Sequence, residues 1–360
     1  MQLFIKHIAH QIESLNDLKK IDKSLLNINE IKAISFLENW FHNKDFVFQS
    51  SGSTGVPKQF IFTKEELIWS ATQTNNYLRL KQNSPHFFIC LDIHLVAGAM
   101  LLARAVLLNA DITIVNPSSN PFEELNENHS YTFASLVPMQ LQSILNTQNG
   151  EKILNQFDNI LLGGAPASES LIKQCANLKA NIWATYGMTE TLSHIALRHL
   201  KTENSFQLLP NNEIALSKEN TLKIKNIITK NQWLQTNDLA AITPNGFSIF
   251  GRIDFIINSG GFKVNALKIE NEIAAYLTFK NIPEFPYFVG SLPDEILGEK
   301  VVIYIEKAHS KMIEFSLLKS YLKENLKPFE IPKQLVFVNE FYYTPSQKID
   351  RIKTIQTTSN

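Results

Sequence analysis

The chain has 360 residues, of which 44% are hydrophobic and 19% charged, an ordinary globular composition with enough material for more than one core. Lys plus Arg and Asp plus Glu both number 34, so the formal charge is zero and the basic footprint of a nucleic-acid-binding protein is missing. The only cysteines, Cys90 and Cys175, lie among apolar residues, which argues against a disulfide framework and indicates buried thiols in a reducing compartment.

The N-terminus shows no basic region followed by a long apolar core, so we expect no secretory signal. The apolar stretch 95–108 is too short to span a membrane and contains Arg104, so it reads as a packed helix. We therefore expect a cytoplasmic protein without a membrane span, whose partners are small molecules.

The first distinctive segment, SSGSTGVPK at 50–58, follows the apolar run 46–48. Its glycines let the backbone turn amide groups towards an anion, its hydroxyls add donors, and Lys58 adds a charge, which is typical of a polyphosphate-binding loop. It is not a Walker A loop, because Pro57 and Gln59 stand where that motif has Gly and Ser or Thr. For the loop alone, a Ser/Gly turn between two strands is the alternative.

Short β-rich runs then alternate with helical patterns. Strands are predicted at 87–91, 112–115, 133–137 and 160–162, and helices at 97–108 and 139–145. Such alternation predicts an α/β fold in which helices cover parallel sheet.

Between 206 and 250 the helical patterns give way to short strands and turns, including 213–216, 222–224 and 244–247, which predicts a small β-rich subdomain. A new series after Arg252 predicts a compact α+β lid, with β-rich or helical runs at 255–264, 269–277, 301–305 and 315–326. We place the boundary at Asp254, which divides the chain into domains 1–253 and 254–360.

Four further segments accompany the loop. They are GGAP at 163–166, TYGMTE at 185–190, GRID at 251–254 running on to NSGGFKV at 258–264, and TPSQKIDR at 344–351. Each alone is weak, but all five in this order resemble the adenylate-forming superfamily of acyl-CoA synthetases, adenylation domains and luciferases. The resemblance implies a large N-terminal AMP-binding domain and a small mobile C-terminal lid.

In that superfamily ATP and a carboxylate give an acyl-adenylate and pyrophosphate, and a thiol, usually that of coenzyme A, then attacks the mixed anhydride. The resemblance therefore implies ATP, Mg²⁺ and coenzyme A. It assigns the β- and γ-phosphates to Ser51, Ser53, Thr54, Gly55 and Lys58. Thr189 would donate to the α-phosphate, and Glu190 would help to hold Mg²⁺, a hard cation that suits a carboxylate oxygen.

The resemblance also implies an adenosine site. Gly164, Ala165 and Pro166 would form one wall, where their lack of bulk permits close approach, and Tyr186, followed by Gly187, would stack on the base. Asp238 would accept hydrogen bonds from the ribose hydroxyls, and Arg252 would add a donor. Asn237 replaces a usual glycine and also adopts left-handed conformations.

Asp254 matches the hinge about which the lid of this superfamily rotates between two poses. Lys348 would serve the adenylate-forming pose by reaching the α-phosphate and carboxylate. Ser259, Gly260 and Gly261 would line the thiol channel in the other pose. Gln347 replaces the glycine that usually precedes the lysine.

Within the superfamily, the stretches 95–105, 189–196 and 256–264 resemble the o-succinylbenzoate-CoA ligases of menaquinone biosynthesis, in a short bacterial form. Their dianionic aromatic substrate needs a cation or strong donor, for which His94, Arg104 and His194 are the candidates. The usual Lys is Ala99 here. Only about fifty residues precede Ser51, so the usual first subdomain would be shortened.

Two alternatives stay open. The chain could adenylate another aryl or fatty acid, or load a carrier-protein thiol. It could also be a catalytically silent nucleotide-binding protein, although the joint presence of Lys348, Glu190 and Asp238 favours an enzyme.

Overall fold

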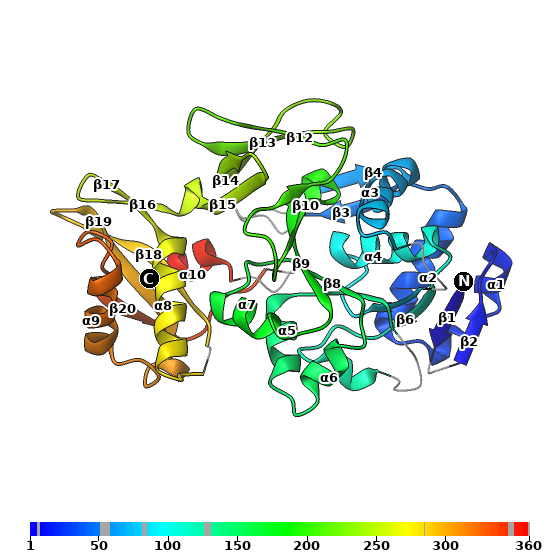
Figure 1. Ribbon diagram of the computed structural model, residues 1–360, viewed down its shortest axis with the longest axis horizontal. Helices are drawn as coiled ribbons and strands as arrows, with labels where there is room; N and C mark the ends of the chain where they lie inside the picture. Colours follow the sequence, from blue (N-terminus) through cyan, green and yellow to red (C-terminus); the bar gives the residue numbers. More distant parts are fainter. Residues whose placement is uncertain are drawn as a thin grey trace.

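The computed structural model describes residues 1–5, 8–50, 58–80, 85–125, 131–283, 285–344 and 349–358. Figure 1 shows an elongated molecule with a broad part built around a large sheet and a smaller part at the other end, which begins near β16.

The large sheet has nine strands in the order β11-β10-β9-β8-β7-β5-β6-β1-β2. The six from β9 to β1 run parallel, and β2, β10 and β11 join antiparallel. Their bounds are β1 (Gln2–Ile5), β2 (Ile8–Gln11), β5 (His86–Ile89), β6 (Asp111–Ile114), β7 (Phe133–Leu136), β8 (Asn159–Leu162), β9 (Asn181–Met188), β10 (Ser193–His199) and β11 (Gln207–Leu208). Largely apolar runs form the central strands β5 and β7, because every residue of these strands is buried.

Helices cover both faces of this sheet. Phe87 and Ile89 pack with α2, α3 and α4, whereas Phe88 between them packs with α5, α6 and α7 on the opposite face. The helices and turns of this part are α1 (Leu15–Lys19), η1 (Lys23–Leu25), α2 (Ile28–Phe41), α3 (Lys64–Tyr77), α4 (Val96–Leu107), η2 (Pro121–Glu124), α5 (Pro138–Leu145), α6 (Gly150–Leu154) and α7 (Glu169–Cys175). The predicted helix-covered parallel sheet is therefore confirmed, as one mixed sheet.

Two smaller β units flank it. The hairpin of β3 (Phe46–Gln49) and β4 (Gln59–Phe62) carries the predicted phosphate loop at its tip. The predicted β-rich subdomain is an antiparallel sheet of β12 (Glu213–Leu216), β13 (Thr221–Lys225), β14 (Leu234–Thr243) and β15 (Gly246–Arg252). It buries Phe247 and Ile224 against Ile195 and Ala196 of β10, so its position depends on the large sheet.

The remaining chain builds a third sheet with its own core, in which α8 and α9 cover the sheet and bury Ile269, Ile273 and Leu318 with Val301 and Ile303. Its elements are η4 (Ile253–Phe255), β16 (Ile256–Ser259), β17 (Phe262–Asn265), α8 (Ala266–Phe279), β18 (Tyr287–Asp294), β19 (Gly298–Glu306), η5 (Lys307–His309), α9 (Phe315–Asn325), β20 (Gln334–Val338) and α10 (Arg351–Thr358).

Two other expectations concern the cysteines and the membrane. Cys90 and Cys175 are free and buried, and burial raises the pKa of both thiols, that of Cys175 to about 11. Within the described ranges, no helix combines the length and the apolar character needed to cross a bilayer.

Candidate active site

The candidate site lies at the carboxyl edge of the large sheet. β8 and β9 are parallel neighbours, with Leu162 opposite Ala184, so the segments that leave them, 163–166 and 185–190, emerge side by side. Gly164 has φ +86°, and Ala165 and Pro166 after it are exposed. The structure thus brings together the two segments to which adenine and α-phosphate contacts were assigned.

A strained turn positions Thr189 and Glu190. They begin η3 (Thr189–Thr191), after which Leu192 and Ser193 have φ +49° and +96°, values that cost energy for residues other than glycine. The Thr191 hydroxyl tightens the turn, since it donates to the Ser193 carbonyl at 2.8 Å and accepts from the Met188 amide at 3.1 Å. Both predicted residues are left half-buried at the edge of the sheet.

Gly187 permits this turn to fold back. A Cβ at this position would lie 2.2 Å from the Ser193 carbonyl oxygen, so only glycine allows β10 to approach β9 here. This role in backbone packing explains Gly187 without any ligand contact.

Asp238 and Tyr186 join the small sheet to the large one. The Tyr186 hydroxyl donates to Asp238 Oδ2 at 2.7 Å, and its ring packs edge-on against Phe247, with centroids 5.3 Å apart. Burial and the neighbouring Asp238 carboxylate raise the pKa of Tyr186, so the phenol keeps its proton. Asp238 is almost fully buried yet retains acceptor capacity, as a partner of ribose hydroxyls must.

Arg252 connects Asp238 to the predicted hinge. Its Nη1 lies 3.6 Å from Asp238 Oδ1 across the β14–β15 pair, and its Nε and Nη2 lie 3.0 and 2.8 Å from the two Asp254 oxygens. Asn237 Nδ2 also donates to Asp254, at 3.4 Å. Although burial opposes ionisation of Asp254, these donors hold its pKa below the usual value.

Arg104 is one of the three predicted acyl contacts. Its side chain is 1% exposed in the last turn of α4, where Nη2 donates to Ser193 Oγ at 3.2 Å and Nε has no partner. None of the ion pairs found in the described part of the chain involves Arg104. Burial lowers the pKa of Arg104 to about 9, so the group is a cation at neutral pH.

His194 lies beside this cation. Its Nε2 is 2.7 Å from Thr74 Oγ1, and its Nδ1 is 3.3 Å from Ser193 Oγ. Burial, and secondly the charge of Arg104, hold the pKa of His194 well below its usual value, so the imidazole is neutral. Asn75 Oδ1, on the same helix as Thr74, is buried without a partner. Two of the three candidate acyl contacts thus meet around Ser193.

His94 does not join them. It is exposed in the turn before α4, where its amide donates to Asp92 at 2.8 Å. Ten residues of mostly helical chain, on the order of 15 Å, separate it from Arg104. Ser193, Thr74 and Asn75 were not predicted as site residues; the one signal for the last two was the run of polar residues 73–75, which the structure buries inside α3.

Part of the predicted phosphate site lies outside the described residues, namely Ser51, Ser53, Thr54 and Gly55. Its two ends are described. The Ser50 amide donates to the Lys58 carbonyl at 2.8 Å, and the Lys58 amide donates to Ser50 Oγ at 3.2 Å, so β3 and β4 close the base of the loop. The Lys58 side chain is exposed.

The predicted thiol-channel residues are far from this site. Ser259, Gly260 and Gly261 lie at the turn of the β16–β17 hairpin, which Figure 1 shows at the far end of the smaller part, away from β8 and β9. Lys348 lies outside the described residues. The segment that contains it is closed by the Tyr343–Ile349 bridge, and Arg351 behind it pairs with Glu270 of α8 at 2.8 Å.

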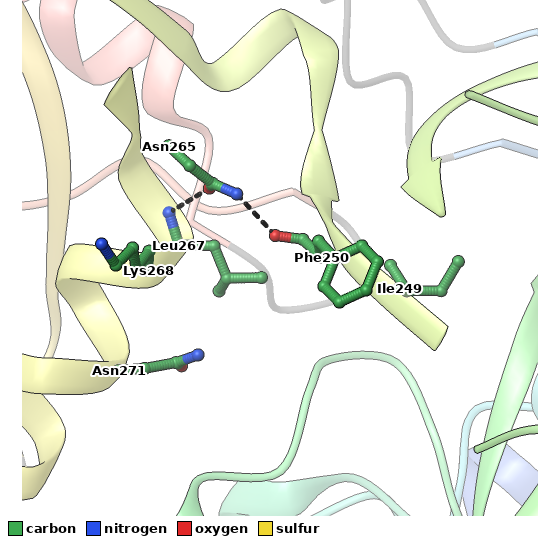
Figure 2. Close-up of a pocket in the computed structure, with 6 residues that line it drawn as sticks. All are labelled: Ile249, Phe250, Asn265, Leu267, Lys268 and Asn271. Atoms are coloured by element: carbon green, nitrogen blue, oxygen red, sulfur yellow. Dashed lines mark hydrogen bonds between the residues drawn. The ribbon is translucent and has the colours of Figure 1, made fainter. Parts of the chain in front are cut away.

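A separate hollow of about 260 Å³ lies where β15 meets α8. Figure 2 shows Asn265 at its rim, where Nδ2 donates to the Phe250 carbonyl at 2.7 Å and Oδ1 accepts from the Leu267 amide at 3.0 Å. One side chain thereby caps α8 and ties it to the small sheet. None of the predicted nucleotide residues lines this hollow.

The fold places the chain in a class of α/β proteins in which a large helix-covered sheet is followed by a small antiparallel sheet and a third sheet with its own core. The sequence profile of AMP-binding enzymes matches residues 13–227, and the chain belongs to this family.

Three relatives are informative. A 2-succinylbenzoate–CoA ligase from a Geobacillus species is 26% identical over 98% of this chain and 77% of its own. An acyl-CoA synthetase (AMP-forming)/AMP-acid ligase II-like protein from Dyadobacter fermentans is 34% identical, covers 96% of this chain and 99% of its own, and has a TM-score of 0.61. The o-succinylbenzoate coenzyme A synthetase of Bacillus subtilis, with ATP and magnesium ion, has a TM-score of 0.75 at 22% identity, over 86% of this chain and 69% of its own. This last likeness concerns the fold alone.

Proposed function

We propose that this protein is an ATP-dependent acid-thiol ligase that converts o-succinylbenzoate first to an acyl-adenylate and then to an acyl-CoA thioester. Membership of the AMP-binding family and the named relatives support an AMP-forming ligase. We place the reaction in the cytoplasm and in menaquinone biosynthesis.

The observation that supports this choice of substrate is the burial of the Arg104 guanidinium without an ion-pair partner among the described residues. A buried cation without a counter-ion is costly, and it is stabilised when an anion enters. Arg104 reaches Ser193 at 3.2 Å, just beyond the turn that presents Thr189 and Glu190. A carboxylate of the acyl substrate paired with Arg104 would leave a second carboxylate for the α-phosphorus, which a dianion such as o-succinylbenzoate can satisfy.

The nucleotide would lie at the carboxyl edge of β8 and β9. Asp238 would accept from the ribose hydroxyls, the exposed segment 164–166 would border the base, and Lys58 with the loop before it would hold the β- and γ-phosphates. Thr189 would donate a hydrogen bond to the α-phosphate, and this bond would align the α-phosphate with the acyl carboxylate.

Glu190 is the residue that we assign to Mg²⁺. Among the described residues no group of three His, Cys, Asp or Glu side chains could hold a metal, which suits an ion bound mainly by substrate phosphates and one carboxylate. When bound, Mg²⁺ neutralises charge that develops on the leaving pyrophosphate.

The division into domains 1–253 and 254–360, with the hinge at Asp254, belongs to this proposal. In the present arrangement α10 lies on the side of the large sheet and the glycine hairpin points away, which fits the adenylate-forming pose. Rotation about Asp254 would bring Ser259, Gly260 and Gly261 to the site for thioester formation.

The test is pyrophosphate release from Mg-ATP across a panel of carboxylates, with and without coenzyme A. We expect release that depends on o-succinylbenzoate and turnover that rises with coenzyme A. Response to another aryl or fatty acid would retain the ligase and discard the menaquinone assignment. ATP binding without release from any acid would overturn the proposal in favour of a silent nucleotide-binding protein.

A further inference from the structure

Four polar side chains form a hydrogen-bonded chain between two helices and the large sheet. Thr74 comes from α3, Arg104 from α4, and Ser193 and His194 from β10. Thr74 Oγ1 lies 2.7 Å from His194 Nε2, and Ser193 Oγ lies 3.3 Å from His194 Nδ1. At the other end, Ser193 Oγ accepts from Arg104 Nη2 at 3.2 Å. All of these side chains are buried except that of Ser193, which is half-buried.

His194 has no ring nitrogen left for a substrate. Both of its nitrogens have partners in the protein, Thr74 on one side and Ser193 on the other. The guanidinium of Arg104, in contrast, has a buried Nε without a partner. The imidazole is therefore placed to position its neighbours, and the guanidinium is the group that remains for an anion.

The charge of Arg104 gives the chain a direction. A guanidinium can only donate, so Ser193 Oγ is an acceptor in this contact. A hydroxyl that accepts from a cation is polarised and becomes a stronger donor, which favours donation from Ser193 to His194 Nδ1. The neutral imidazole then carries its proton on Nε2 and donates it to Thr74 Oγ1. Thr74 is thus the acceptor at which the chain ends.

We propose that Thr74 is a positioning residue that makes the site select acids with two carboxylates. It acts through His194 and Ser193, which hold the Arg104 guanidinium in place to receive the second carboxylate. The inference rests on the proposed function and deepens it by naming what sets the acid preference.

The Thr74 hydroxyl matters because of the proton on His194. Without this hydroxyl, the Nε2 proton would be buried without an acceptor, so the imidazole would turn or move its proton to Nδ1. Either change would weaken the bond between Ser193 and Arg104, because the ring would no longer accept from the hydroxyl or would compete for its lone pairs. The site would then lose preference for the second carboxylate.

The experiment compares o-succinylbenzoate with 3-benzoylpropionate, which has the same keto acid chain and lacks the carboxylate on the ring. Pyrophosphate release from Mg-ATP gives kcat/KM for each acid. Thr74→Val keeps the shape and removes the hydroxyl, and should lower kcat/KM for o-succinylbenzoate about tenfold, the effect of about one hydrogen bond. The value for 3-benzoylpropionate and KM for ATP should be unchanged. Thr74→Ser, which keeps a hydroxyl, should retain the preference.

Thr113 provides a matched control. Its Oγ1 lies 2.8 Å from His86 Nε2, and both residues are buried. Thr113 stands opposite Phe88 in the β5–β6 pair, on the sheet face away from α4. Thr113→Val therefore removes the same kind of contact outside the site, and should leave the preference between the two acids unchanged.

A second measurement follows the direction of the chain itself. Nitrogen NMR of isotope-labelled histidine, assigned by comparison with His194→Gln, should show the Nε2–H tautomer of His194 in the wild type. Thr74→Val should reduce this preference. If Thr74→Val does not fold, Ser193→Ala tests the chain from its other end, with the same loss expected for o-succinylbenzoate alone.

An equal loss for both acids in Thr74→Val, or no loss for o-succinylbenzoate, would overturn the inference while the ligase stands. A changed acid preference in Thr113→Val, or an Nδ1–H tautomer of His194 in the wild type, would also overturn it. Failure of wild-type pyrophosphate release with every carboxylate would instead show that the proposed function itself is wrong.

Discussion

Burial of the Arg104 side chain lowers the free energy of unfolding. Its guanidinium donates to the neutral hydroxyl of Ser193 and lies near the neutral imidazole of His194, with Nε unpaired. Among the described residues no ion pair compensates this buried charge. Such a site is expected to lower the stability of the folded protein while it favours binding of an anionic substrate. Substitutions can separate these two effects.

Arg104→Met should therefore lower kcat/KM for o-succinylbenzoate by about 10- to 100-fold, since a charge-assisted hydrogen bond contributes about 1.5–3 kcal/mol. KM for ATP should not change. Thermal unfolding without substrate should occur at the same or a higher temperature than in the wild type. Arg198→Met is the matched control, since this half-buried arginine on β10 also has an unpartnered Nε. An equal loss in both variants would contradict the assignment.

His194 predicts a pH dependence of stability. Its folded pKa lies well below the ordinary value of 6.5, so the unfolded chain binds the extra proton first as the pH falls. The His194 contribution to the free energy of unfolding should be constant above about pH 6.5 and decline below it, by up to about 1.4 kcal/mol per pH unit. Denaturant unfolding of wild type and His194→Gln between pH 5 and 8 checks this. Parallel curves would show that His194 is not buried as a neutral group.

Asp238→Asn should weaken nucleotide binding, because the amide replaces one acceptor oxygen by a donor group. We expect KM for ATP to rise about tenfold or more, with a smaller effect for Tyr186→Phe, which removes one hydrogen bond to the same carboxylate. Isothermal titration with ATP separates affinity from turnover. Equal affinity in the Asp238→Asn variant and the wild type would remove Asp238 from the ribose site.

At the scale of elements, the central strands of the large sheet were easier to predict from the sequence than its edge strands. Strands β5 and β7 are buried at every position because both faces are covered, so the largely apolar runs 87–91 and 133–137 were visible in sequence. β1 was not predicted, because its partner β6 lies more than a hundred residues away. The β9–β10 pair was also missed, since Gly187 and the polar turn after it interrupt the apolar pattern.

In the candidate site, too, local features were predictable from sequence and long-range contacts were not. The predictions for Thr189, Asp238 and Arg104 came from local motifs, because each residue stands in a distinctive short segment. The contact between Arg104 and Ser193 joins residues 89 apart in the chain, and the partner Thr74 lies on a third element. Such long-range contacts depend on how the helices pack on the sheet. The hydrophobic periodicity of the sequence does not specify this packing.

Gly187→Ala should disrupt the turn that follows β9. The added Cβ would overlap the Ser193 carbonyl, and we expect a loss of about 2 kcal/mol or more in the free energy of unfolding, together with reduced pyrophosphate release. Gly261→Ala is the comparison: it meets no neighbour but has φ +81°, so a loss of about 1 kcal/mol is expected. Chemical denaturation measures both. A larger loss at Gly261 would contradict this account.

At the scale of the whole molecule, the two chemical steps would use different faces of the lid. Arg351, just behind the segment of Lys348, is fixed to the lid by its pair with Glu270 at 2.8 Å and its position over Phe255, 4.6 Å from the ring centroid. The helix α10, which begins at Arg351, should therefore move with the lid as a unit.

Lys348→Ala should abolish adenylate formation yet leave thioester formation from supplied acyl-adenylate largely intact, because in the proposed mechanism the lysine serves only the first pose. Single-turnover assays of each half-reaction provide the test. Equal loss of both would contradict the two-pose mechanism.

Arg252 has one further consequence. A single guanidinium is shared between Asp238, assigned to the ribose, and Asp254, assigned to the hinge. If the ribose hydroxyls of a bound nucleotide donate hydrogen bonds to Asp238, the interaction of Arg252 with Asp254 changes. The preferred orientation of the lid would then depend on whether nucleotide is bound. Thermodynamic reciprocity then requires the converse: lid orientation must alter nucleotide affinity by the same free energy. Release of AMP after the thioester forms would then be driven by the rotation that made the thioester possible.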